Sequence, residues 1–589
     1  MSDFYNNSFT NWIKNNSTAL MWLVIIIYPF LFLWQGLNFS DEGNALTIYQ
    51  SIFSDPASIS DTFGTYGTSI IGGLWLKFFG NFGVAGVRFA GALVSVLTLV
   101  FAYFIFREYI DKKILLLGLL VSSVFSYHFL TFNLLSYNNL SALFFVIAIF
   151  FLIKGLKNNS VLPIFGAGLI LFFNALVRLP NILGMLFIFA IPLNRYIKND
   201  INLNKSLKQC VMFLFGALSG YFVAIYIMKS LGHYDYYVKS ISYLLDATQP
   251  HGPYGGLLFE TLKGYSNLFS DGILLFLLIL FAIFVYLYLK IGRLNFFIKS
   301  FFLLLFLFLL YIKYNPWGVP IGFRFVELLT GICYVILLLH ILNYKKYNKN
   351  LSIIAFLILI ALIVIPAASG ARQINSLFIM PVAFPLVLNS IYNIKKIKFA
   401  LSISNKELSQ DTSIAAEIEN KLLHKIMNSL IIIFVAYSLV NAFVFTYNDS
   451  YNRFSLNAKI NHKYFRGIYT TKEKAEPLNE LIAEFPKYIE DGDTILVTWI
   501  APIIYYLTNT RPYFPHPWTE VYKRYKIEKF FSENPKDTKL PVVIRYNYSQ
   551  KHEYDDILFQ FFQKNLYKKK WSNKVYEIYT PIIPKNNER

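Results

Sequence analysis

Long apolar runs separated by short polar loops fill the first 445 residues. A stretch of about 20 apolar residues is needed to cross the roughly 30 Å hydrocarbon core of a bilayer as a helix. The runs therefore predict a polytopic α-helical membrane protein with about 13 transmembrane helices. The predicted spans are roughly 19–37, 84–106, 114–130, 138–156, 160–177, 180–194, 209–231, 271–290, 299–312, 325–343, 351–367, 377–394 and 427–445. The first run lacks a basic leader and an Ala-x-Ala site, which favours a retained anchor over a cleaved signal peptide.

Loop charges predict the orientation of these spans. If the N-terminus is cytoplasmic, Lys and Arg are about three times as frequent in the inside loops as in the outside loops, as the positive-inside rule requires. Two outside loops, 38–83 and 232–270, are long. Within the first, residues 68–80 are apolar but short and glycine-broken, which predicts a helix lying in the membrane interface. A half-length span is the alternative.

The chain changes character after residue 445. Helical periodicity over 472–489, 502–507 and 554–565 alternates with strand-like runs at 494–498, 540–546 and 574–579. We therefore expect a multi-span transmembrane catalytic domain, 1–445, followed by a small soluble α/β domain, 446–589, on the outer side. Tyr513, His516 and Trp518, in a Pro-rich loop, are contact candidates there, and a purely structural loop is equally compatible with the pattern.

Composition narrows the class of protein. The 589 residues are 56% hydrophobic, 18% aromatic and only 15% charged. The net charge of +20 resides in short loops between apolar runs, so it orients helices and does not indicate a nucleic-acid partner. Cys210 and Cys333 lie inside apolar runs, which excludes a disulfide framework.

Abundant Lys, Asn, Ile, Phe and Tyr fit an AT-rich bacterial genome and thus a bacterial inner membrane. A eukaryotic equivalent would face the endoplasmic-reticulum lumen.

Candidate chemistry gathers at the predicted outer ends of the spans. Asp41 and Glu42 form an acidic pair directly after the first span, where carboxylates beside a bilayer often mark chemistry; a helix N-cap is the ordinary alternative for Asp41. Few arginines are predicted outside, so each is a candidate phosphate ligand, with snorkelling to lipid headgroups as the alternative. These arginines are Arg178, Arg324 and Arg372.

Polar and aromatic residues in nearby outside turns are the candidates for substrate contact. Asn133, Tyr137 and Asn138 lie in one short turn, where His128 is more typical of a structural role. His233 opens the second long loop, whose aromatic residues suit stacking on a sugar or a lipid headgroup, although an interfacial aromatic belt explains them equally well.

Taken in order, these features resemble the GT-C superfamily of membrane glycosyltransferases, especially the branch of protein O-mannosyltransferases and lipid A aminoarabinose transferases. The resemblance covers most of residues 20–400 as a pattern. It is carried by Asp41-Glu42, the stretch from Tyr66 to Arg88, the Arg178-Leu179-Pro180 turn, and the many-span body with an outside C-terminal domain. Many relatives have His-Pro-Pro in the first loop, where this chain has Gly64-Thr65-Tyr66-Gly67.

The resemblance implies transfer of a sugar from a polyprenyl-phosphate donor to an acceptor on the outer face of the membrane. Asp41 would be the general base of an inverting reaction and Glu42 would orient it or the acceptor. Arg178, Arg324 and Arg372 would stabilise the leaving phosphate, and Tyr66 would join the substrate-binding residues. No metal is then needed, whereas a diphosphate donor would favour a divalent ion on Asp41 and Glu42.

Two other functions remain open from the sequence. A glycan polymerase or ligase would use a diphosphate-linked donor, and residues 232–270 contain His233 and His251 but no Arg for that chemistry. A lipid-linked glycan transporter is less favoured, because no internal repeat is apparent and ionisable residues within the spans are scarce. The sugar, and whether the acceptor is a protein, a lipid or a glycan, stay open.

Overall fold

The structure is a computed structural model of the chain. It describes residues 16–59, 64–127, 134–200, 202–246, 321–345, 347–367, 372–393, 431, 435–444, 446, 449–450, 452–519, 524–533, 540–547 and 555–582. The predicted spans 271–290 and 299–312 lie outside these residues, as do His128 and Asn133.

Helices dominate the described part of the first 445 residues. Outside the first loop they are α4 (Gly83–Phe106), α5 (Lys112–Ser126), α6 (Tyr137–Asn158), α7 (Val161–Val177), α8 (Ala190–Lys198), α9 (Leu203–Ser230), α10 (Tyr234–Asp246), α14 (Ile321–Leu342), α15 (Lys349–Val364) and α16 (Met380–Tyr392). In the described part, five segments are long and apolar enough to cross a membrane: Tyr66–Phe106, Tyr137–Asn158, Leu179–Lys198, Leu203–Ser230 and Ile374–Tyr392. The chain is thus a multi-pass membrane protein, and the number of about thirteen spans stays a prediction.

Local sequence explains where several helices begin. Asp111 precedes α5 and its carboxylate accepts the backbone N–H groups of Lys113 and Ile114, which satisfies donors that the helix itself leaves unpaired. Asn202 does the same for α9 through the N–H of Lys205. At the start of α6 the side chain of Asn139 accepts the backbone N–H of Ser136 at 2.9 Å.

The first long loop folds into helices. It contains α2 (Asp41–Ser51), the 3₁₀ turn η2 (Pro56–Ile59), α3 (Tyr66–Phe79) and the 3₁₀ turn η3 (Gly80–Phe82), which leads into α4. The helix predicted at 68–80 is therefore present as α3, slightly longer than expected. Its place in the membrane interface stays a prediction.

The C-terminal part is built on a five-stranded sheet with the order β4-β3-β5-β7-β6. Its strands are β3 (Thr494–Val497), β4 (Arg511–Pro512), β5 (Val542–Tyr546), β6 (Tyr567–Ser572) and β7 (Tyr576–Pro581). Strand β3 pairs in parallel with β4 and β5, whereas β7 is antiparallel to β5 and β6. A second, two-stranded sheet pairs β1 (Ala458–Lys459) with β2 (Tyr469–Thr470).

Four helices cover the larger sheet: α18 (Lys472–Glu484), α19 (Ile503–Thr508), α20 (Arg524–Glu533) and α21 (Asp555–Lys564). Alternate residues of a strand point to opposite faces. Ile495 accordingly packs in one core with residues of α18 and α19, and Leu496 packs in another with residues of α20 and α21. All six elements predicted in this region are present, while β1, β2, β4, β6 and α20 were not predicted.

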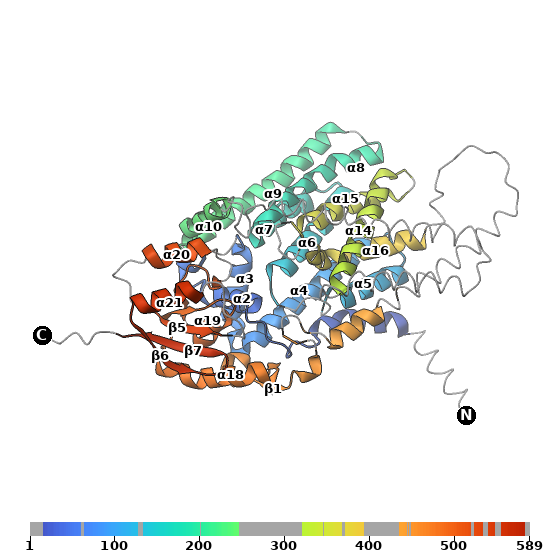
Figure 1. The fold of residues 1–589 in the computed structure, drawn as a ribbon. Helices are drawn as coiled ribbons and strands as arrows, with labels where there is room; N and C mark the ends of the chain where they lie inside the picture. Colours follow the sequence, from blue (N-terminus) through green and yellow to red (C-terminus); the bar gives the residue numbers. More distant parts are fainter. Residues whose placement is uncertain are drawn as a thin grey trace, which may run out of the picture.

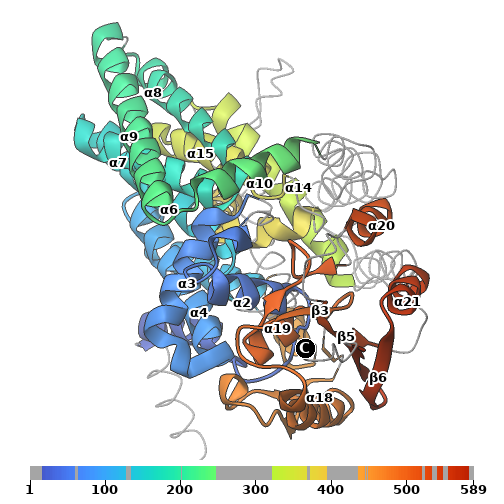
Figure 2. The same ribbon diagram turned by 90° about the vertical axis from the view of Figure 1, so that its left-hand side faces the viewer.

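The first loop lies between the helical body and the sheet, with α2 beside α19 (Figures 1 and 2). The core that contains Ile495 also includes Leu37, Leu46 and Val87 from the first loop and α4. One hydrophobic core thus crosses the predicted boundary at residue 445.

Candidate active site

Asp41 stands at the first position of α2 and is held there by Asn38. The predicted alternative made Asp41 an N-cap, but the N-cap position belongs to Ser40. The buried Asn38 side chain performs the capping: its Oδ1 accepts the backbone N–H groups of Ser40 at 3.0 Å and Asp41 at 3.1 Å. The Asp41 carboxylate is half-buried, and a helix N-terminus favours a negative charge.

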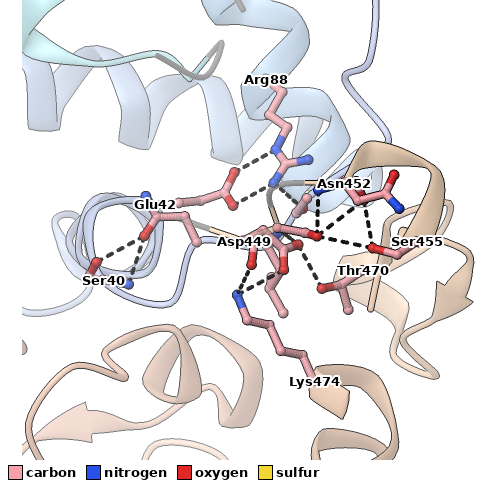
Figure 3. Close-up of polar contacts among 12 residues, drawn as sticks. Ser40, Glu42, Arg88, Asp449, Asn452, Ser455, Thr470 and Lys474 are labelled. Atoms are coloured by element: carbon pink, nitrogen blue, oxygen red, sulfur yellow. Dashed lines mark hydrogen bonds and ion pairs between the residues drawn. The ribbon is translucent and has the colours of Figure 1, made fainter. Parts of the chain in front are cut away.

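Glu42 has a different environment. It is 0% exposed and forms a two-pronged ion pair with Arg88 of α4, with Nε–Oε1 and Nη2–Oε2 distances of 2.7 Å (Figure 3). Arg88 is 4% exposed and also donates to the carbonyls of Leu33 and Gly36 at 2.9 and 2.8 Å. Such fork-to-fork pairs are geometrically specific. Both oxygens of Glu42 are therefore engaged within the fold, and its predicted role of orienting Asp41 or the acceptor stays a prediction.

Tyr137 interacts with both Asp41 and Arg178. Tyr137 is the first residue of α6, and the Arg178 guanidinium lies 5.5 Å from the centroid of its ring. The Tyr137 hydroxyl interacts electrostatically with both Arg178 and Asp41. Arg178 is buried at the end of α7, where Nη1 donates to the carbonyl of Ile365 at 2.6 Å and Nη2 to that of Ala367. The Arg178 guanidinium thus lies over the Tyr137 ring, and the Asp41 carboxylate is near enough to interact electrostatically with the same side chain.

Tyr66 and His233 are also brought together, but as a pair with each other. The Tyr66 hydroxyl lies 3.2 Å from His233 Nδ1, and His233 Nε2 lies 2.9 Å from the carbonyl of Ile52. Both residues are buried, and burial lowers the pKa of His233. The backbone next to Tyr66 runs along the Arg178 turn, because Leu179 donates its N–H to the carbonyl of Gly64 at 3.2 Å.

The remaining predicted residues are placed less completely. Asn138 follows Tyr137 in α6 and interacts with its hydroxyl. Arg324 belongs to α14 and Arg372 begins the 3₁₀ segment Arg372–Ile379, but their side chains lie outside the described part, as does all of Asn133. The carbonyls that Arg178 binds are at 365 and 367, shortly before Arg372 in the chain.

Other expectations concern the C-terminal loop and metals. His516 is 0% exposed, and its Nδ1 accepts the backbone N–H of Trp518 at 3.1 Å, so its side chain supports the loop from inside. Among the residues that the structure describes, no three His, Cys, Asp or Glu side chains gather as metal ligands would.

Sequence analysis missed two residues of this region. One is Arg88, and the other is Asp449, whose Oδ2 accepts the backbone N–H of Leu37 at 2.7 Å, next to Asn38. Arg88 did carry a signal, because an arginine within an apolar run is costly unless it is paired. Asp449 carried none, since it lies in a short polar segment with no periodicity.

Comparisons with known proteins give similarity at the level of structure only. No protein-family profile matches the sequence, and no curated protein matches it. The chain is similar to an oligosaccharyltransferase, AglB from Archaeoglobus fulgidus in complex with an inhibitory peptide and a dolichol-phosphate, at TM-score 0.42 and 12% identity, over 91% of this chain and 70% of that chain. A second structure of the A. fulgidus oligosaccharyltransferase, tethered with an acceptor peptide, gives TM-score 0.44 and 12% identity over the same shares of the two chains.

A third similar structure is ArnT from Cupriavidus metallidurans bound to undecaprenyl phosphate. It matches at TM-score 0.42 and 9% identity over 97% of this chain and 98% of that chain. Similarity at these scores and identities is evidence for neither a residue role nor a reaction step in this chain.

Proposed function

We propose that this protein is a membrane glycosyltransferase that moves a sugar from a polyprenyl-phosphate donor to an acceptor, with Asp41 as the general base. The observation that carries the proposal is the presence of Arg178 over the Tyr137 ring together with the electrostatic interaction of Asp41 with the same tyrosine. Transfer of a sugar from a phosphate needs a base for the acceptor and positive charge for the leaving group, and this place supplies both.

The two acids of the pair differ in what they can do. Glu42 is fully buried and bound by Arg88, whereas Asp41 is half-buried beside Tyr137. Of the two acids we therefore assign Asp41 to take a proton from an acceptor hydroxyl while the anomeric carbon is attacked from the face opposite the phosphate. Attack from that face inverts the configuration of the sugar.

Arg178 is suited to the leaving phosphate. Its guanidinium is fixed by the carbonyls of Ile365 and Ala367, and a fixed charge stabilises developing negative charge without reorganisation. We further propose that Arg324 and Arg372 contribute charge from their neighbouring elements and that Tyr66, Asn133, Tyr137, Asn138 and His233 contact the substrates. We place the protein in a bacterial inner membrane with the C-terminal region on the periplasmic side.

The test is transfer of a labelled sugar from undecaprenyl phosphate to acceptors in native membranes. Asp41→Asn should lower transfer by about 10² or more with donor binding retained, because the amide cannot take the proton. Asp55→Asn is the matched control: Asp55 is another acid of the same loop, and its contact is a local cap on Ala57. Unchanged transfer by Asp41→Asn would exclude this mechanism, and no transfer by wild type would favour the diphosphate-linked polymerase or ligase.

A further inference from the structure

The segment 33–38 lies between the first apolar helix, Asn16–Phe30, and α2, and it is held by contacts from distant parts of the chain. On one side Arg88 binds the carbonyls of Leu33, Gln35 and Gly36. On the other side Gly36 donates its N–H to the carbonyl of Tyr469 at 2.9 Å. Gly36 has φ +92°, and a Cβ there would lie 2.4 Å from Thr446 Cγ2, so this position requires glycine.

Asp449, from the C-terminal part of the chain, also binds the 33–38 segment. Its Oδ2 accepts the backbone N–H of Leu37 at 2.7 Å and the hydroxyl of Thr470 at 2.7 Å. Its Oδ1 lies 2.9 Å from Lys474 Nζ, and its side chain is 0% exposed (Figure 3). A buried carboxylate that binds a backbone N–H directly makes a stronger bond than a neutral acceptor would.

The contact between Asp449 and Leu37 lies one residue before Asn38, which caps the start of α2. Asp449 binds the N–H of Leu37, and the next residue is Asn38, whose side chain holds the backbone of Asp41. Leu37, Asn38 and Asp41 lie within five consecutive residues, so loosening the bond to Leu37 frees Asn38, which fixes the backbone of Asp41. A small misplacement of a catalytic group can cost a large factor in rate.

Arg453 provides a second set of contacts between the C-terminal part of the chain and this segment. Arg453, four residues after Asp449, places its guanidinium 4.2 Å from the centroid of the Phe32 ring. Its Nε donates to the carbonyl of Ala442 at 2.7 Å and its Nη1 lies 3.4 Å from Gln35 Oε1. The chain that follows the apolar helix Val435–Val444 is thereby bound to the chain that follows the first apolar helix.

We propose that Asp449 is a positioning residue for Asp41: through Leu37 it holds the 33–38 segment, so the C-terminal region takes part in building the active site. The structural half of this inference stands on the contacts of Asp449. The catalytic half rests on the proposed function of Asp41.

Amide hydrogen exchange of the full-length protein tests the structural half. Asp449→Ala should speed exchange in the peptide 34–41 by about 10- to 100-fold, because a buried charged hydrogen bond is lost. Asp449→Asn retains an oxygen acceptor and should bring exchange back to within about fivefold of wild type. Asp555→Ala is the matched control, since Asp555 is a 1% exposed aspartate paired with Arg545 away from this segment.

The outcomes separate the alternatives. Faster exchange in 34–41 with Asp449→Ala and not with Asp555→Ala supports the inference. Wild-type exchange in Asp449→Ala overturns it, and so does equally fast exchange in Asp555→Ala, which would mean general loosening of the C-terminal region.

Steady-state transfer from undecaprenyl-phosphate-linked sugar tests the catalytic half. Asp449→Ala should lower kcat by about tenfold or more and change the donor KM by less than about twofold, because the base is displaced while donor binding persists. Asp449→Asn should recover most of kcat. Faster exchange without a fall in kcat overturns the positioning role. Absence of transfer in wild type overturns the proposed function instead, and the exchange result then still decides whether Asp449 holds the segment.

Discussion

At the scale of residues, Asp41 and Glu42 are adjacent in the sequence but have different environments in the fold. The sequence predicted an acidic pair at the mouth of a span, and two neighbouring carboxylates suggested shared chemistry. On a helix, neighbouring residues point about 100° apart, so one acid can face α4 while the other faces α6. The partner of Glu42 was hidden in the apolar run of α4, because only the fold brings Arg88 to it.

The Glu42–Arg88 pair leads to a prediction about stability. Removing one partner leaves a buried charge unpaired, which costs about 3–5 kcal/mol. Arg88→Met should therefore lower the melting temperature in detergent strongly, and Glu42→Gln/Arg88→Met should recover much of the loss. Should the double variant be stable and still transfer sugar at the wild-type rate, Glu42 has no orienting role; should it be stable and inactive, that role gains support.

At the scale of elements, the close approach of α2 to α19 fixes the helix that carries Asp41. A Cβ added to Gly43 would lie 2.3 Å from the backbone nitrogen of Ile503. Thr47 donates its hydroxyl to the carbonyl of Pro502 at 3.0 Å on the same side of α2. Periodicity predicted α19 itself, but a contact between residues 43 and 503 has no local signal.

Gly43→Ala should consequently push α2 away from α19, since a backbone atom cannot give way. We expect a loss of about 1–3 kcal/mol in unfolding free energy and a fall in sugar transfer. Gly80→Ala is the control, because nothing lies within 4 Å of a Cβ there. Melting temperatures and transfer rates of the two variants check the prediction; equal effects at both positions would contradict it.

The loop between β4 and α20 leads to a prediction about pH. Burial lowers the pKa of His516 to about 3, whereas an unfolded histidine titrates near 6.5. The unfolded state therefore binds more protons below about pH 6.5, so stability is complete above that pH and falls on acidification. The slope is at most about 1.4 kcal/mol per pH unit for one such group. His516→Asn, measured by thermal unfolding between pH 7 and pH 4.5, should show a shallower decline than wild type.

Strand β6 shows why some elements of the C-terminal region escaped prediction. Three of its six residues, Lys568–Lys570, are exposed lysines, and the strand lies at the edge of the sheet, so no buried alternation marks it as a strand. The two-residue strand β4 is too short to show any period. Strands β3 and β5, by contrast, lie inside the sheet and contain the apolar runs 495–497 and 542–544, which are typical of buried strands.

At the scale of the whole molecule, one hydrophobic core contains residues from both sides of the predicted boundary at 445. Composition changes there, and the later residues contain the five-stranded sheet. Yet the core that joins Leu37 and Leu46 to Ile495 and Ile544 is continuous. Because hydrophobic burial is non-directional, a sequence reveals which residues are apolar but not which distant apolar residues share a core.

The two faces of β3 allow the shared core to be tested within one strand. Ile495 belongs to the core shared with the first loop, and its neighbour Leu496 belongs to the core under α20 and α21. Both are nearly fully buried, so each substitution by alanine should cost about 2–5 kcal/mol. Ile495→Ala should speed amide exchange in residues 37–49, whereas Leu496→Ala should confine its effect to the C-terminal region. Equal effects of both variants on residues 37–49 would mean that the sheet unfolds as one body and carries the first loop with it, in which case the positioning of Asp41 depends on the stability of the entire C-terminal region.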